Sequence, residues 1–217
     1  MKDKKLLSDI KEYLKCYEDQ VLEDWYELIR HISVSETGEG IETCCDWIQK
    51  KMEEIGIQVT KYSVKPAPVL VGRFGNDPEK KTVLIYAHYD VKPAGERKLW
   101  HSDPFVPTVR DGKVYARGSA DNKSPLMAHL KALEYFIRRK MEVPVNVIFV
   151  FEGDEECGSR GLEEFLAEHR TELAADLVFF SDGPKDPSGL PIIALGAKGD
   201  LSIHITVETM NRNVHAR

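Results

Sequence analysis

Residues 82–90 have the sequence TVLIYAHYD, an apolar run that leads directly into a histidine and an aspartate. Short apolar runs without polar interruption are typical of strands covered on both faces, as in a mostly parallel sheet. Two further runs have the same character, VNVIFVF at 145–151 and DLVFFS at 176–181. We therefore expect three buried strands of one central sheet.

Three-and-four spacing of apolar residues predicts helices between and before these runs. The expected helices are a long opening helix over 6–32, one over 41–55 that ends at Gly56, one over 124–139 with Ser124 as N-cap, and one over 161–173. A strand is expected at 57–64 and a hairpin around Asp111-Gly112, because both turn residues tolerate positive φ. The alternation of strands and helices predicts an α/β fold with helices on both faces of the sheet.

The pattern changes near the end of the chain. From about Ala197, KGDLSIHITVET alternates with period two and predicts a strand that begins a second domain. The expected domains are therefore 1–196 and 197–217. Turn and capping signals are lacking around NRNVHAR at 211–217, so we expect the chain to be cut rather than finished.

Composition narrows the classes of function. The chain has 217 residues, of which 42% are hydrophobic, enough to bury a core. Its net charge of −6 argues against a nucleic-acid partner, and its charged N-terminus lacks an apolar segment of signal-peptide or membrane-spanning length. The four cysteines form no CxxC pair and are expected to be free thiols. We expect a cytoplasmic protein without membrane or nucleic-acid partners.

Polar side chains able to bind metal follow each apolar run directly. In open α/β sheets, ligands bind at the carboxyl ends of the strands, so these side chains should converge at one edge. Asp121 joins them from a loop just before a helix, whose unpaired N–H groups point toward the same edge. The residues expected at this edge are His88, Asp90, Asp121, Glu152, Asp154, Glu155, Glu156 and Asp182.

Carboxylates gathered this closely need a compensating charge, because each raises the pKa of the others. Each motif alone has an ordinary interpretation: a polar strand end for His-x-Asp, a solvated surface for Glu-Glu and a turn for Asp-Gly. Their recurrence at successive strand ends favours a metal site. Imidazole with carboxylates suits zinc, with manganese or cobalt as alternatives, and two ions sharing Asp121 would use the available charge.

Three stretches of the chain resemble the M20 metallopeptidases, in particular their carnosinase-like dipeptidase branch. They are YAHYDVKPAGERKLWHSDPFVPTVRDGKVYARGSADNKSPLMAHLKALE at 86–134, FEGDEECGSRGLEEFL at 151–166 and NRNVHAR at 211–217. The resemblance implies the N-terminal half of such an enzyme. Residues 1–196 would belong to its catalytic domain, and residues 197–217 would carry the first strand of an α+β lid or dimerisation domain.

The resemblance also implies a metal-ligand set. His88 and Asp182 would hold one divalent ion, Glu156 would hold the other, and Asp121 would bridge them. The family's last ligand of the second ion, a histidine near its C-terminus, has no counterpart in this chain. One ion would therefore be held well and the other poorly.

Further roles follow from the same resemblance. Asp90 would orient His88, Glu155 would be the general base, and the Asp121-Asn122 peptide would be cis. His215 would reach the active site of the partner subunit in a homodimer of the full-length form and stabilise the oxyanion. The family pattern after that histidine is Ser-Gly, whereas this chain has Ala-Arg.

The function expected from these residues is two-metal hydrolysis of the amide bond in dipeptides or other small peptides. Glu155 would accept the proton of a water that bridges the two ions. Three alternatives stay open: a catalytically silent metal-binding fragment, one half of a split enzyme, and an enzyme that uses the same chemistry on N-acyl amino acids.

Overall fold

The computed structural model describes residues 2–183, 188–190, 192–193, 199, 201 and 203–207. The chain divides into two units, 1–182 and 183–217. All helices and strands of the described residues lie in the first unit. The domain boundary expected at residues 196 and 197 stays a prediction.

The central sheet has five strands in the order β1-β2-β6-β3-β7. Strand β2 is antiparallel to both neighbours, whereas β3 is parallel to both β6 and β7, so four of the five strands point the same way. The predicted mostly parallel sheet is confirmed. The strand bounds are β1 Gln58–Tyr62, β2 Val69–Phe74, β3 Thr82–His88, β6 Asn146–Glu152 and β7 Leu177–Phe180.

Strand β2 is not expected from the sequence, because Pro66 and Pro68 precede it and Gly72 interrupts its apolar run. The glycine has a packing reason. A Cβ at position 72 would lie 2.2 Å from Cε of Met52, a residue of the helix that covers this strand. Glycine therefore lets the Met52 side chain pack directly on the strand, and a larger residue here would force that side chain to move.

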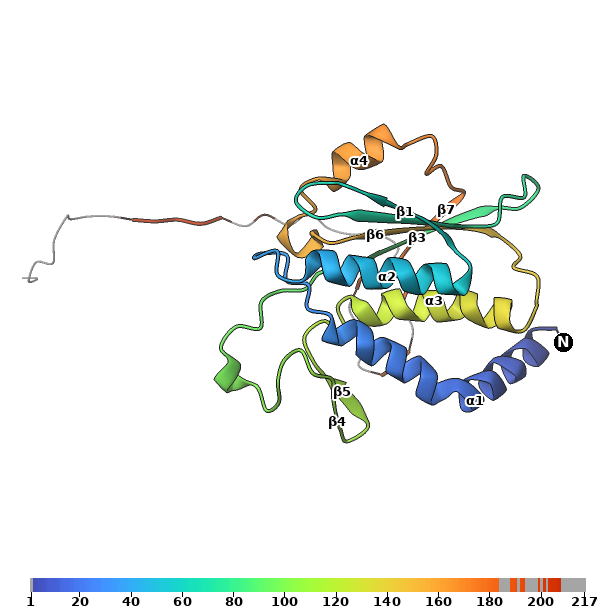
Figure 1. The fold of residues 1–217 in the computed structure, drawn as a ribbon, viewed down its shortest axis with the longest axis horizontal. Coiled ribbons are helices and arrows are strands. Elements are labelled where there is room, and N and C mark those ends of the chain that lie inside the picture. The colour runs from blue at the N-terminus through green and yellow to red at the C-terminus, as the bar shows by residue number, and fades with distance from the viewer. Residues whose placement is uncertain are drawn as a thin grey trace, which may run out of the picture. The chain divides into compact units, whose positions relative to one another are not determined.

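Helices cover both faces of the sheet, as predicted (Figure 1). Their bounds are α1 Lys2–Arg30, α2 Ile41–Ile55, α3 Lys123–Arg138 and α4 Leu162–Glu168. On one face, Met52 of α2 and Leu130 of α3 pack with Phe149 of β6 in a single buried cluster. On the other face, Phe165 of α4 packs with Val150 of β6. The sheet is thus buried on both sides, which explains its uninterrupted apolar strands.

Two helix predictions need correction. Helix α4 ends at Glu168 instead of extending to residue 173. Helix α3 begins at Lys123, so Asn122 rather than Ser124 occupies the N-cap position. The Asn122 side chain donates to the Ser181 carbonyl at 3.0 Å and makes no capping bond, because it ties the start of α3 to the segment after β7.

A small hairpin lies between β3 and α3, as predicted. Strands β4 Thr108–Arg110 and β5 Lys113–Tyr115 pair around Asp111 and Gly112, which have φ of 51° and 70°. One short 3₁₀ helix, Arg97–Leu99 (η1), precedes the hairpin, and another, Glu155–Cys157 (η2), follows β6. None of the four cysteines is in a disulfide.

The strand expected from about Ala197 is not formed at residues 203–207. Among the described residues these five have no partner strand, and Ile203 and Ile205 are 72% and 77% exposed. Period-two alternation is not sufficient for a strand, because its backbone groups need a neighbouring strand to pair with. The lid strand therefore stays a prediction, because residues 203–207 have no pairing strand among the described residues, and His215 lies outside the described residues.

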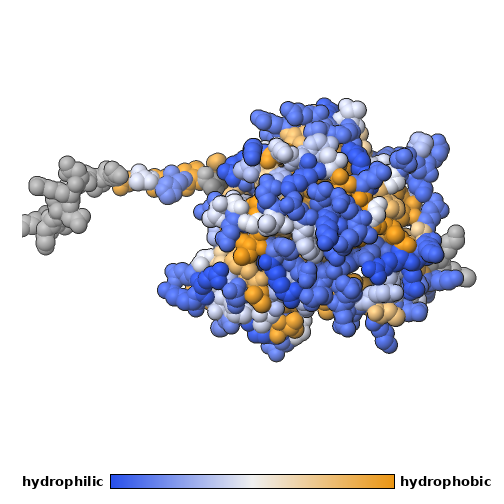
Figure 2. Space-filling model, viewed as in Figure 1, coloured by the Kyte–Doolittle hydropathy of each residue, from blue (hydrophilic) through white to orange (hydrophobic). Residues whose placement is uncertain are grey.

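The face seen in Figure 2 is predominantly hydrophilic, in keeping with a chain in which 30% of the residues are charged. No helix in the described part of the chain has both the length and the apolar character needed to cross a bilayer.

Candidate metal centre

The parallel strands β3, β6 and β7 bring the predicted site residues to one sheet edge. His88, the last residue of β3, is in register with Glu152 of β6, and Tyr86 is in register with Phe180, the last residue of β7. The segments that follow the three strands therefore begin side by side. This is the edge at which open α/β sheets bind ligands.

Three of the predicted residues form a group, hereafter the His-Asp-Asp group: His88, Asp121 and Asp182. One ligand atom of each lies within 4.8 Å of the others. His88 Nε2 is 3.0 Å from Asp121 Oδ1 and 3.4 Å from Asp182 Oδ2. An imidazole nitrogen and two carboxylate oxygens at this spacing fit a single divalent ion.

Asp90 contacts the His88 ring at Nδ1, the nitrogen that faces away from Asp121 and Asp182, and both side chains are fully buried. Nδ1 of His88 lies 3.3 Å from Oδ1 of Asp90. Burial lowers the pKa of His88, but the bond to Asp90 and the charges of Asp90, Glu155 and Asp182 outweigh it and raise the pKa to about 9. Such a carboxylate partner fixes the ring orientation of a metal-binding histidine.

Asp90 also organises the acidic loop, which we define as residues 153–160. Its two carboxylate oxygens accept the peptide N–H groups of Glu155 at 3.2 Å and Glu156 at 3.0 Å. Burial raises the pKa of Asp90, but its hydrogen bonds, first from His88 and Ser35, hold the pKa below its usual range. One ionised carboxylate thus fixes the imidazole and the loop together.

Glu155 lies at the open side of the His-Asp-Asp group. Its Oε2 is 3.8 Å from His88 Nε2, and its side chain is 37% exposed. Burial raises the pKa of Glu155, and the charges of Asp182 and Glu156 add to burial against the opposing charge of His88. A partly exposed carboxyl with a raised pKa is suited to accept and return a proton.

Glu156 is not a member of the His-Asp-Asp group. Its Oε2 lies 3.4 Å from Nζ of Lys92, which also donates to the Glu156 carbonyl oxygen. The structure therefore places four predicted residues around the His88 ring, namely Asp90, Asp121, Glu155 and Asp182. It pairs the fifth carboxylate, that of Glu156, with a lysine.

Glu152 and Asp154 lie at the same edge but are occupied by protein partners. Glu152 Oε1 accepts the hydroxyls of Tyr86 at 2.5 Å and Ser159 at 2.7 Å. Asp154 makes a bidentate pair with Arg160 at 2.9 and 2.7 Å. Both carboxylates hold the acidic loop in place. Neither set of hydrogen-bond partners could be predicted from the sequence pattern.

The loop that carries Asp121 is fixed by the residue that begins α3, Lys123. The Asp121-Asn122 peptide is cis, as predicted. The buried ammonium of Lys123 donates to the carbonyls of Leu28 at 3.1 Å and His31 at 2.6 Å, which ties the loop to the end of α1. This position of Lys123 cannot be found from the sequence, because its partners are carbonyls of a distant helix.

The segment that carries Asp182 is fixed by α3. His129 Nε2 lies 2.8 Å from the Ser181 hydroxyl, and Asn122 holds the Ser181 carbonyl. Burial lowers the pKa of His129. The ring is therefore a packing and hydrogen-bonding group rather than a further ligand.

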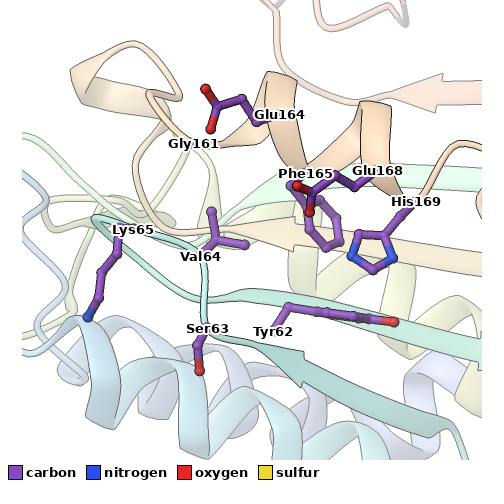
Figure 3. A pocket seen from close by; sticks show the side chains of 9 residues that line it. All are labelled: Tyr62, Ser63, Val64, Lys65, Gly161, Glu164, Phe165, Glu168 and His169. Carbon is purple, nitrogen blue, oxygen red and sulfur yellow. The ribbon is translucent and has the colours of Figure 1, made fainter.

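A groove of about 290 Å³ lies away from these residues, between the end of β1 and α4 (Figure 3). Figure 3 shows Glu164, Glu168 and His169 of the α4 region above Tyr62 and Val64. None of the predicted site residues lines it, so the metal edge remains the candidate site.

Comparison with known proteins agrees with this geometry. The profile described as peptidase family M20/M25/M40 matches residues 84–215. This chain belongs to the M20 peptidase family. The predicted resemblance is thereby confirmed, and the matched residues include the whole metal edge.

Curated relatives of this M20 chain include dipeptidases. A Cys-Gly metallodipeptidase of Schizosaccharomyces pombe is 40% identical over 172 residues, which cover 76% of this chain and 36% of the relative. The Beta-Ala-His dipeptidase of Homo sapiens is 36% identical over 151 residues, which cover 69% of this chain and 30% of the relative. The chain therefore spans about a third of the length of these relatives.

Solved structures of the family superpose well on the M20 chain. Human carnosine dipeptidase 1 has a TM-score of 0.78 at 30% identity, with 82% of this chain and 41% of that chain covered. The M20 metallo-carboxypeptidase Sso-CP2 of Sulfolobus solfataricus has a TM-score of 0.74 at 36% identity, with 78% and 38% covered.

Proposed function

We propose that this chain carries the metal-binding part of an M20 peptidase that hydrolyses the amide bond of dipeptides or other small peptides. The observation that carries the proposal is the position of the Glu155 carboxylate, 3.8 Å from His88 Nε2 at the open side of the His-Asp-Asp group. A proton acceptor beside a cation-binding group is the arrangement needed for metal-assisted hydrolysis.

Each residue has a role in this proposal. His88 and Asp182 would hold one ion, Asp121 would be shared with a second, and Glu156 would be the further ligand of the second ion. Divalent ions, zinc first and manganese or cobalt as alternatives, supply a lowered pKa for water and polarise the substrate carbonyl. The first proposed position is supported by three side chains whose ligand atoms lie within 4.8 Å of one another, whereas the second would rely on Asp121 and on a Glu156 that is paired with Lys92.

Proton transfer is assigned to Glu155. Its carboxylate accepts the proton of the attacking water and returns it to the leaving amine. Asp90 keeps the His88 ring and the acidic loop in fixed positions relative to each other during this transfer. His215, which lies outside the described residues, is proposed to donate to the oxyanion across a homodimer of the full-length protein.

The substrate class is inferred from the relatives. The names of two relatives specify Cys-Gly and Beta-Ala-His dipeptides. We extend the dipeptide class, and a cytoplasmic location, to this chain as proposals. N-acyl amino acids remain the alternative substrate because they present the same amide bond.

A second candidate function follows from the length of this chain relative to its curated relatives. Because the chain spans about a third of its relatives, it can act as a metal-binding fragment or as half of a split enzyme. Native mass spectrometry separates the cases, since a stoichiometric heavier partner indicates a split enzyme. A species of 24.7 kDa alone indicates a fragment.

The test of the function compares Glu155→Gln with Glu164→Gln, a matched change at an exposed position of α4. Each protein is titrated with zinc or manganese and assayed on dipeptides and N-acyl amino acids. We expect Glu155→Gln to retain metal binding and to lose at least about 100-fold in turnover, a loss typical of a missing general base. Hydrolysis at the parental rate by Glu155→Gln would show that the base is another residue.

A further inference from the structure

Lys92 reaches from the segment after β3 to the acidic loop. Its Nζ lies 3.4 Å from Glu156 Oε2 and donates to the carbonyl oxygen of the same residue. The Glu156 side chain is only 14% exposed, whereas that of Lys92 is 53% exposed. The ammonium therefore lies on the solvent side of a carboxylate that is largely shielded.

The other carboxylates proposed as metal ligands have a different partner. In the described part of the chain, the ion pairs of Asp121 and Asp182 are made with His88. Glu156 is thus the one proposed ligand whose carboxylate is paired with a lysine there. Of the two proposed metal positions, the second is therefore the one with a ligand that is already paired with a protein cation.

A lysine in this place opposes a second ion in two ways. The Glu156 carboxylate must give up its ion pair before it can coordinate a metal. The ammonium would also stand close to a divalent cation, which repels it. Both effects act in the same direction, and both are removed if Lys92 swings into solvent.

The chain around Lys92 permits this movement. The backbone of the preceding residue is fixed, because Val91 forms a bridge with Val34 and donates its N–H to the Ser33 carbonyl at 2.8 Å. The four-carbon stem of a half-exposed lysine is flexible. Displacement of the ammonium therefore requires side-chain rotation and no change in the sheet edge.

We propose that Lys92 controls metal stoichiometry by holding the Glu156 carboxylate until a second divalent ion displaces it. The first ion then binds at the His-Asp-Asp group, and the second binds weakly because it must expel Lys92. This inference rests on the proposed function, since it takes Glu156 as a ligand of the second ion.

Zinc binding by the purified chain tests the proposal through calorimetry and native mass spectrometry. Lys92→Met removes the charge and keeps most of the stem, whereas Lys92→Arg keeps the charge. Lys98→Met is the matched control, because Lys98 is 79% exposed and pairs with Glu96 at 2.7 Å, outside the proposed ligand set.

We expect Lys92→Met to strengthen the second binding step about fivefold, the scale of one exposed ion pair, and to leave the first step within about twofold. Lys92→Arg and Lys98→Met should match the parental chain. Glu156→Gln should abolish the second step in the parental chain and in Lys92→Met alike.

The outcomes separate the two proposals. A parental chain that binds no zinc would overturn the metal centre, and the role of Lys92 with it. A chain that binds one ion while Lys92→Met leaves the second step unchanged or weaker would overturn the role of Lys92 alone. Persistence of the second step in Glu156→Gln would also overturn it.

Discussion

His88 Nδ1 lies 3.3 Å from Asp90 Oδ1, and both side chains are completely buried. The same carboxylate accepts the N–H groups of Glu155 and Glu156. The imidazole proposed as a metal ligand and the loop that carries the proposed base therefore share one anchor. A change at Asp90 should disturb both.

Replacement of Asp90 by asparagine should weaken zinc binding about 10- to 100-fold, because the ring loses the carboxylate that orients it. The amides of Glu155 and Glu156 should exchange faster with solvent, as one acceptor is lost. Isothermal titration and hydrogen exchange measure the two effects. Asp111→Asn is the control, since Asp111 lies in the exposed β4-β5 turn and asparagine also tolerates its φ of 51°. Unchanged zinc affinity in Asp90→Asn would contradict the assigned role.

Zinc affinity should rise with pH across the neutral range. The pKa of His88 is raised to about 9 in the metal-free protein, so the ring is protonated at neutral pH and must lose its proton to bind an ion. The apparent affinity is expected to increase roughly tenfold per pH unit from pH 7 to pH 8. Calorimetry in buffers of different ionisation enthalpy should show about one proton released per first ion. An affinity independent of pH in this window would argue against a protonated His88.

The same raised pKa has an opposite effect on the metal-free fold. Because the folded pKa of His88 is above its unfolded value, its contribution to the free energy of unfolding is complete below about pH 6.5 and is lost as pH rises toward 9. Urea unfolding with a chelator present should therefore show lower stability at pH 9 than at pH 6.5. His88→Gln should flatten this part of the profile.

Asp24 should make the fold sensitive to acid. Burial raises its pKa, but hydrogen bonds and charge from Lys131 and Lys51 outweigh burial and lower it. A lowered pKa means that the stabilisation is present above about pH 4, the unfolded value, and is lost as pH falls below it. Asp24→Asn should cost about 1 to 3 kcal/mol at pH 7, because Lys131 loses one buried partner but keeps its pair with Glu134.

Urea unfolding between pH 3 and pH 8 tests this prediction. Asp46→Asn is the control, because Asp46 pairs with Lys61 but its side chain is 64% exposed. It should cost no more than about 1 kcal/mol. Equal losses in the two variants would show that burial of Asp24 does not strengthen its pairs.

Asn122→Ala should weaken zinc binding by about tenfold and lower stability by about 1 to 2 kcal/mol, because the bond to the Ser181 carbonyl joins the loops of two proposed metal ligands. Asn76→Ala changes the same side chain at an exposed site and should do neither. Metal titration and thermal unfolding of both variants measure the difference. A loss of stability without a loss of affinity would mean that the bond supports the fold alone.

The sequence by itself determined the class of fold and the location of the site. The apolar runs that lead into His88, Glu152 and Asp182 are local patterns in the sequence. Parallel strands necessarily bring the carboxyl ends of such runs to one edge of the sheet. The helix over 41–55 could equally be predicted from the sequence, because the spacing of its apolar residues and its terminating Gly56 lie within one short segment.

Only the tertiary structure decided which acidic residues are free to bind metal. Glu152 ends β6, and Asp154 and Glu156 follow it directly. Two of these three carboxylates nevertheless hold the acidic loop, and the third, that of Glu156, is paired with Lys92, 64 residues away in the chain. Lys123 likewise meets the carbonyl of Leu28 across 95 residues. Hydrophobic periodicity reports which face of an element is buried, whereas ion pairs and hydrogen bonds depend on which elements the packing brings into contact.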